Sequence, residues 1–216
     1  IVAITDEYKK ANRKSVRKSK GQFFTSLTTA KYMAVKAAKK AESLFILDPG
    51  CGNALLAAAV VENCIQTRKC FHFNITLVEN DEAVLDTLNK SINIIEQYVA
   101  ENGGSVHFTL IKENFITYTP TNKFDIVISN PPYKKLRKDS KEAGQYVLIT
   151  PRSWTTGLYY KALRQYLFKS LNIEELLLFD DRENVFKDED VLQETMITIG
   201  KKSEEQGKNI QICIAT

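Results

Sequence analysis

The 216-residue sequence has no apolar run near the roughly 20 residues that a membrane-spanning helix needs. Its N-terminus also lacks the secretory-signal order of a basic stretch, an apolar stretch and a small-residue cleavage site. With 44% hydrophobic and 26% charged residues, the composition is typical of a soluble globular domain with one sizeable core. We therefore expect a single cytoplasmic domain.

Cysteine is scarce, and its spacing excludes the common metal-binding patterns. The four cysteines form no Cys-x-x-Cys pair, and Cys70 with the nearby His72 offers too few ligands for a metal ion. We interpret the cysteines as reduced thiols and expect no metal site.

The net charge is also small, at +4, and by itself does not indicate a nucleic-acid partner. The distribution of charge is more informative, because basic residues crowd residues 9–20 and 134–138. Such a run is most often a solvated surface. Two runs that flank one site would, however, suit a phosphate backbone.

Short apolar runs alternate with helical patterns along the chain. Helical spacing of apolar residues predicts helices over residues 28–41, with Thr28 as N-cap, and over residues 84–99. Residues 54–61 are apolar on all sides, as in a buried helix, and a last helix fits residues 159–171. Strands fit residues 44–47, 75–78, 106–111, 124–129, 146–150, 173–179 and 196–200. This alternation predicts an α/β fold, with a doubly wound, mostly parallel seven-stranded sheet and helices on both faces.

Two features suggest that part of the protein is missing. The chain starts with Ile1 and stops after a strand-like run at 210–214, so we expect a fragment of a longer protein. The connection between Tyr133 and Tyr146 is too short and too polar for the usual crossover helix. We therefore expect a helical segment to be absent near residues 139–141.

Polar residues follow four of the predicted strands, at 48–53, 79–80, 113–115 and 129–133. In a parallel sheet these ends meet at one edge, where ligands bind. They therefore converge on one candidate site.

The first of these breaks, DPGCGN, is a glycine turn between a strand and a helix. Gly50 and Gly52 would let a ligand approach the backbone at the helix N-terminus. The spacing is not that of G-x-G-x-x-G, and no G-K-[ST] follows, which disfavours a pyrophosphate. A ligand with a carboxylate and an amino group would suit the helix N–H groups together with Asp48. Glu79, about 30 residues later, can accept both hydroxyls of a ribose, so the two breaks together suggest S-adenosylmethionine.

The last break, in FDIVISNPPY, follows an apolar strand. Asn130 has a side-chain carbonyl oxygen, and the prolines stiffen the loop that carries the backbone carbonyl of Pro131. Two acceptors on a rigid loop can hold both hydrogens of a conjugated NH₂ group and make its nitrogen nucleophilic. Tyr133 can then stack on the planar group.

Over residues 8–200 the sequence resembles the N6-adenine DNA methyltransferases of the gamma arrangement found in restriction–modification systems. The resemblance rests on GQFFT at 21–25, DPGCGNALL at 48–56, Glu79 with Asn80, and SNPPY at 129–133. It implies a Rossmann-like methyltransferase fold. It also implies that S-adenosylmethionine contacts Phe23, Thr25, Asp48, Gly50, Gly52, Glu79, Asn80, Asn114, Phe115 and Asn130.

The resemblance assigns catalysis to Asn130, Pro131 and Tyr133, with Tyr160 as a second aromatic that sandwiches the target base and Tyr159 as the fallback. One departure is Asn114-Phe115, where the family usually has Asp-Phe. The implied organisation is a basic segment carrying a cofactor motif at 1–27 and a catalytic domain at 28–216. A target-recognition domain would lie after residue 216.

The implied reaction is in-line methyl transfer to N6 of a flipped adenine in double-stranded DNA, in a bacterial or archaeal cell. A nuclease or a specificity subunit is the expected protein partner, and neither a membrane nor a metal is implied. Three alternatives stay open: adenine methylation of RNA, glutamine methylation of a protein, and a cofactor-binding docking module without activity.

Overall fold

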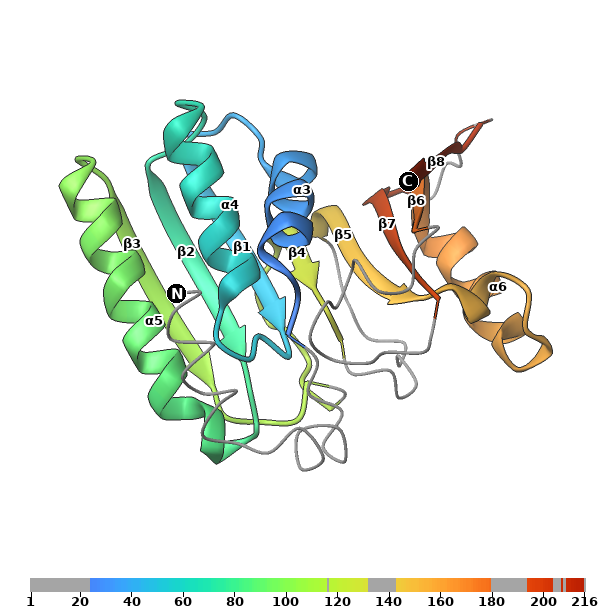
Figure 1. The fold of residues 1–216 in the computed structure, drawn as a ribbon, viewed down its shortest axis with the longest axis horizontal. Coiled ribbons are helices and arrows are strands. Elements are labelled where there is room, and N and C mark those ends of the chain that lie inside the picture. Colours follow the sequence, from blue (N-terminus) through green and yellow to red (C-terminus); the bar gives the residue numbers. More distant parts are fainter. Residues whose placement is uncertain are drawn as a thin grey trace.

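The computed structural model describes residues 24–115, 117–131, 143–179, 194–203, 207 and 209–215. Within these residues, none of the helices is long and apolar enough to span a membrane. The chain forms a twisted sheet with helices packed against it (Figure 1).

The sheet has eight strands in the order β3-β2-β1-β4-β5-β7-β6-β8. Their bounds are β1 Ser43–Pro49, β2 His72–Val78, β3 Ser105–Ile111, β4 Phe124–Ser129, β5 Ala143–Pro151, β6 Leu171–Phe179, β7 Thr195–Lys202 and β8 Gln211–Ala215. Strands β3, β2, β1, β4 and β5 are mutually parallel, and β7 runs antiparallel to both β5 and β6. This confirms the predicted mostly parallel α/β sheet. The prediction of seven strands was one short, because the run at 210–214 pairs with β6 as a parallel edge strand.

Three helices cover one face of the sheet: α3 (Leu27–Ala37), α4 (Leu55–Gln66) and α5 (Glu82–Glu101). Figure 1 shows them next to one another, and their apolar residues share one core with the inward side chains of the strands. Most of α4 is buried, as its apolar sequence predicts. The N-cap of α3 is Ser26, whose hydroxyl accepts the Thr29 N–H at 3.1 Å. The prediction of Thr28 was wrong, since Ser26 is equally able to cap and has the extended backbone that an N-cap needs.

The opposite face carries the short helix α6 (Lys161–Ser170), preceded by the 3₁₀ turns η1 (Arg152–Thr155) and η2 (Leu158–Tyr160). Trp154 of η1 and the apolar side of α6 pack on a second core that includes Leu47 and Val127. The neighbouring residues Ile46 and Ile126 point into the first core. The central strands are therefore apolar on both faces, as expected for a parallel sheet covered on both sides.

The carboxyl ends of the parallel strands form one edge of the sheet. Register pairs Pro49 with Val78 and Val78 with Ile111, so the chain leaves β1, β2 and β3 at the same level. This edge is at the bottom of Figure 1. The β4–β5 connection, which contains the gap expected near residues 139–141, lies outside the described residues.

Candidate active site

In the glycine turn after β1, every second residue has a positive φ angle. Gly50, Gly52 and Ala54 have φ angles of 71°, 55° and 60°. The N–H groups of Gly50 and Cys51 both donate to the carbonyl oxygen of Val78, at 2.8 and 3.1 Å. These bonds hold the turn against the end of β2 and aim the N-terminus of α4 at the site.

Phe24 covers this turn. A Cβ at Gly52 would lie 3.5 Å from Cε1 of Phe24, and Phe24 is buried together with Val84 at the start of α5. The positive φ of Gly52 favours glycine, whereas a Cβ there would make only an ordinary van der Waals contact with the Phe24 ring. The sequence-based assignment chose the preceding residue, Phe23, which lies outside the described residues. GQFFT contains two adjacent phenylalanines, and the sequence alone does not tell which of them contacts the glycine turn.

Asp48 is the most unusual side chain at this edge. It is 1% exposed, and neither carboxyl oxygen has a hydrogen-bond partner among the described residues. Burial raises its pKa to about 8; the nearby backbone N–H of Ala57, which lies outside hydrogen-bond geometry, opposes this shift, and the charge of Glu79 adds to it. A buried carboxyl group without a partner is costly. It is suited to receive a cationic donor, such as the ammonium group of an amino-acid ligand.

Glu79 joins the ends of β1 and β2. Its Oε2 accepts the N–H of Gly52 at 2.9 Å, and its Oε1 accepts the N–H groups of Asn80 and Asp81 at 2.9 and 2.8 Å. A carboxylate has about four acceptor positions, so these bonds fix its orientation and leave capacity for a ligand hydroxyl. Its role toward a ribose stays a prediction.

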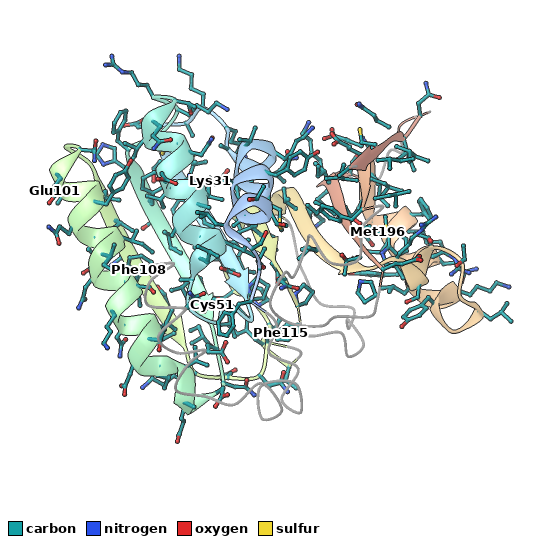
Figure 2. The ribbon with its side chains drawn as sticks, in the orientation of Figure 1. Lys31, Cys51, Glu101, Phe108, Phe115 and Met196 are labelled. Carbon is teal, nitrogen blue, oxygen red and sulfur yellow. The ribbon has the colours of Figure 1, made fainter. Side chains whose placement is uncertain are left out.

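The third strand ends in a turn formed by Asn114 and Phe115. The carbonyl oxygen of Asn114 accepts the N–H groups of Thr117 and Tyr118 at 2.9 and 3.0 Å. The side chains of Asn114 and Asn80 are exposed, whereas Phe115 packs on the second core. In Figure 2, Phe115 and Cys51 of the glycine turn lie at the same edge of the sheet, the edge reached by β1 and β2.

The end of β4 is tied to two other parts of the site. The hydroxyl of Ser129 donates to the carbonyl oxygen of Pro49 at 2.6 Å, which joins β4 to the start of the glycine turn. The side-chain Nδ2 of Asn130 donates to Oγ1 of Thr25 at 3.1 Å. Pro131 is buried beside it. The structure thus brings Asn130 and Pro131 to the edge that carries Asp48, as the sequence predicted, and adds Ser129 as a positioning contact that the sequence analysis missed.

The predicted aromatic sandwich is only partly described. Tyr133 lies outside the described residues, as does the side chain of Tyr159. Tyr160 is half-buried at the start of α6, where it packs on the second core. A pairing of Tyr160 with Tyr133 therefore stays a prediction.

Cys51 in the glycine turn is a free thiol and is 8% exposed. Burial, followed by the negative charges of Asp48 and Glu79, raises its pKa well above the ordinary value. Since the thiolate is the nucleophilic form, Cys51 is suited to packing rather than to covalent catalysis.

Residues 29–153 match the family described as the methyltransferase small domain. The chain belongs to this family. It is 27% identical to the type II methyltransferase M.BsuBI of Bacillus subtilis over 91% of this chain and 46% of that protein. M.PstI of Providencia stuartii is also 27% identical, over 94% of this chain and 47% of its own length. The chain thus spans about half the length of these type II relatives.

Two further similarities extend this result. A tRNA1(Val) (adenine(37)-N6)-methyltransferase of Bacteroides thetaiotaomicron is 30% identical over 41% of this chain and 32% of its own. A Listeria monocytogenes structure assigned to the class I S-adenosylmethionine-dependent methyltransferases superposes with a TM-score of 0.65 and 15% identity, covering 87% of this chain and 63% of that one. At this identity the superposition supports the fold alone.

The family and the fold imply S-adenosylmethionine as the cofactor. The residues present fit it. Asp48 is a buried, unpartnered acid for the ammonium group, the turn at Gly52 brings backbone close to a ligand, and Glu79 is an oriented acceptor at the end of β2.

Proposed function

We propose that this chain is the catalytic part of a methyltransferase that modifies N6 of adenine in DNA, within a restriction–modification system. The observation that carries the proposal is the position of Asn130, which lies beside Pro131 at the same sheet edge as Asp48 and Glu79. The similarity to type II methyltransferases along most of the chain supports DNA as the substrate.

The chemistry of the site follows from its acceptors. The side-chain oxygen of Asn130 and the backbone carbonyl of Pro131 accept the two hydrogens of the target amine, which moves its lone pair out of conjugation with the ring. S-adenosylmethionine supplies a methyl group that its sulfonium already makes labile. The protein therefore contributes mainly by holding the amine nitrogen in line with that methyl group.

The target adenine has to leave the duplex to reach a site between strand ends, at a cost of a few kcal/mol. Stacking between Tyr133 and a second aromatic, with Tyr160 as the candidate, would repay part of this cost. The basic runs at 9–20 and 134–138 would contact the phosphate backbone. A nuclease or specificity subunit completes the proposed system.

RNA is the second candidate substrate, because a tRNA N6-adenine methyltransferase matches 41% of this chain at 30% identity. A protein glutamine would suit the same acceptors, since its side chain is also a planar amide. A docking module without catalysis would keep Asp48 and Glu79 but would have no need of Asn130.

The test is to incubate the protein with labelled S-adenosylmethionine and, separately, with duplex DNA, RNA and a glutamine-bearing protein. We expect label in N6-methyladenine from DNA. The Asn130→Ala variant should transfer at least about a hundredfold more slowly while binding the cofactor nearly as well, because only the acceptor for the amine is lost. Label in RNA or protein alone would replace the proposed substrate, and label in none of them would favour the docking module.

A further inference from the structure

We infer that Thr25 is a positioning residue that fixes the orientation of the Asn130 side-chain amide, so that its oxygen faces the target amine. The inference rests on the proposed function and adds to it a residue that acts through Asn130. The observation behind it is the 3.1 Å hydrogen bond from Nδ2 of Asn130 to Oγ1 of Thr25, which joins residues 105 positions apart.

Thr25 is well placed to act as a fixed point. It is 8% exposed and lies between two anchored neighbours. On one side, Phe24 packs with Val84 and against Gly52. On the other, Ser26 caps α3 by accepting the Thr29 N–H at 3.1 Å, and its hydroxyl lies 2.8 Å from that of Thr29. The backbone of Thr25 is therefore anchored on one side by the packing of Phe24 and on the other by the start of α3.

The orientation of the amide decides whether Asn130 can serve the reaction. An asparagine side chain presents an acceptor on one side and two donors on the other, and only the acceptor can take a hydrogen from an amine. With Nδ2 directed to Thr25, the oxygen lies on the opposite side of the amide. A rotation of about 180° would turn the N–H groups toward the amine and lose the acceptor. It would also break the Nδ2–Oγ1 bond, which could be replaced only by a bond in which the Thr25 hydroxyl donates to Oδ1.

The backbone at the end of β4, which carries Asn130, is held independently of Thr25. The bond from Ser129 to the carbonyl oxygen of Pro49 is 2.6 Å long, and β4 is paired on both sides, with β1 and with β5. Loss of the Thr25 hydroxyl should therefore release the side chain of Asn130 without moving the strand that carries it. This predicts an effect on the rate of transfer that is separate from any effect on folding.

The test compares Thr25→Val, which keeps the shape but removes the hydroxyl, with Thr25→Ser, which keeps the hydroxyl. We expect Thr25→Val to lower kcat about tenfold, the value of one ordinary hydrogen bond, with little change in the KM for DNA. Because the resemblance also places Thr25 against the cofactor, the Kd of S-adenosylmethionine is measured in the same variant and should change by clearly less than kcat does. Thr25→Ser should restore most of the rate. Thr29→Val is the matched control, since it removes a buried threonine hydroxyl from the same turn without touching Asn130.

A double variant separates positioning from a general structural role. In an Asn130→Ala background there is no amide to orient, so adding Thr25→Val should cause no further loss of rate. An equal loss in both backgrounds, a cofactor Kd that weakens as much as kcat falls, or a Thr25→Val enzyme as fast as wild type would each overturn the inference. If the wild-type enzyme transfers no methyl group to any substrate, the proposed function itself fails, and the two failures are thereby distinguished.

Discussion

Strands β2 and β8, on opposite sides of the sheet, differ in how completely they are packed. On one side, β2 lies between β1 and β3, and its apolar residues are almost fully buried, although the edge strand β3 itself has no buried residue. On the other, β8 is an edge strand whose Ile212 and Ile214 are each 63% exposed, and α6 has no fully buried residue (Figure 1). Asp48 and Glu79, the residues proposed to hold the cofactor, lie at the ends of β1 and β2. The proposed cofactor site is therefore supported by well-buried strands.

The largest expected effect comes from a matched pair of isoleucines, one on each of these strands. Ile75 on β2 is 1% exposed, so Ile75→Ala should lower the free energy of unfolding by about 2–5 kcal/mol through lost burial and an unfilled cavity. Ile214→Ala, the same change on β8, should cost less than about 0.5 kcal/mol. Urea denaturation measures both values. Equal losses of unfolding free energy in the two variants would show that the exposed face of β8 is covered in solution. The difference in packing between β2 and β8 would then not exist.

The next prediction concerns the buried acid at the end of β1. The pKa of Asp48 is raised from 3.8 to about 8 in the folded protein, so its neutral form is the one that folding favours. Its contribution to stability is therefore full below about pH 4 and is lost as the pH rises toward 8. The difference in unfolding free energy between wild type and Asp48→Asn should fall across this range.

The control for Asp48 is Asp86→Asn, the same change at an exposed position of α5. Its denaturation curves should follow those of wild type at each pH. If the difference in unfolding free energy between wild type and Asp48→Asn is equally independent of pH, Asp48 is not held in the neutral form. It would then not be an acid kept ready for a cationic ligand group.

The smallest expected effect concerns the backbone of the glycine turn. Ala54 has a φ of 60°, a left-handed conformation that costs an L-residue roughly 1 kcal/mol. Relief of this strain in Ala54→Gly should roughly offset the loss of a fully buried methyl group, so the free energy of unfolding should change by less than about 0.5 kcal/mol. Ala57→Gly, equally buried but inside α4, is the control and should lower the free energy of unfolding by about 1 kcal/mol or more. Equal losses in the two variants would mean that the turn carries no strain at Ala54.

The sequence predicted the parts of this molecule that depend on local pattern. The apolar runs located the first seven strands, and the polar residues after them located the shared edge that carries Asp48, Glu79 and Asn130. The eighth strand was visible as a pattern, but its pairing with β6 depends on tertiary packing. The cap of α3 was misplaced by two residues because Ser26 and Thr28 have the same capping chemistry.

The contacts that complete the site could not be read from the sequence. The bond between Thr25 and Asn130 joins the chain before α3 to the end of β4, and the bond from Gly52 to Glu79 joins two different strand ends. Both depend on the register of the sheet, which no local pattern contains. The contact of Phe24 with Gly52 illustrates the same limit, since only the folded chain shows it, whereas the cofactor contact of Phe23 stays a prediction.

The most direct test of the central claim is a calorimetric titration of S-adenosylmethionine into the protein and into Glu79→Gln. We predict one binding site in the wild-type protein and about tenfold weaker binding in the variant, because a charge-assisted acceptor is replaced by a neutral one. Glu82→Gln, at the exposed first residue of α5, should bind like wild type. No heat of binding to the wild-type protein, or an unchanged affinity in Glu79→Gln, would contradict a cofactor site at these strand ends.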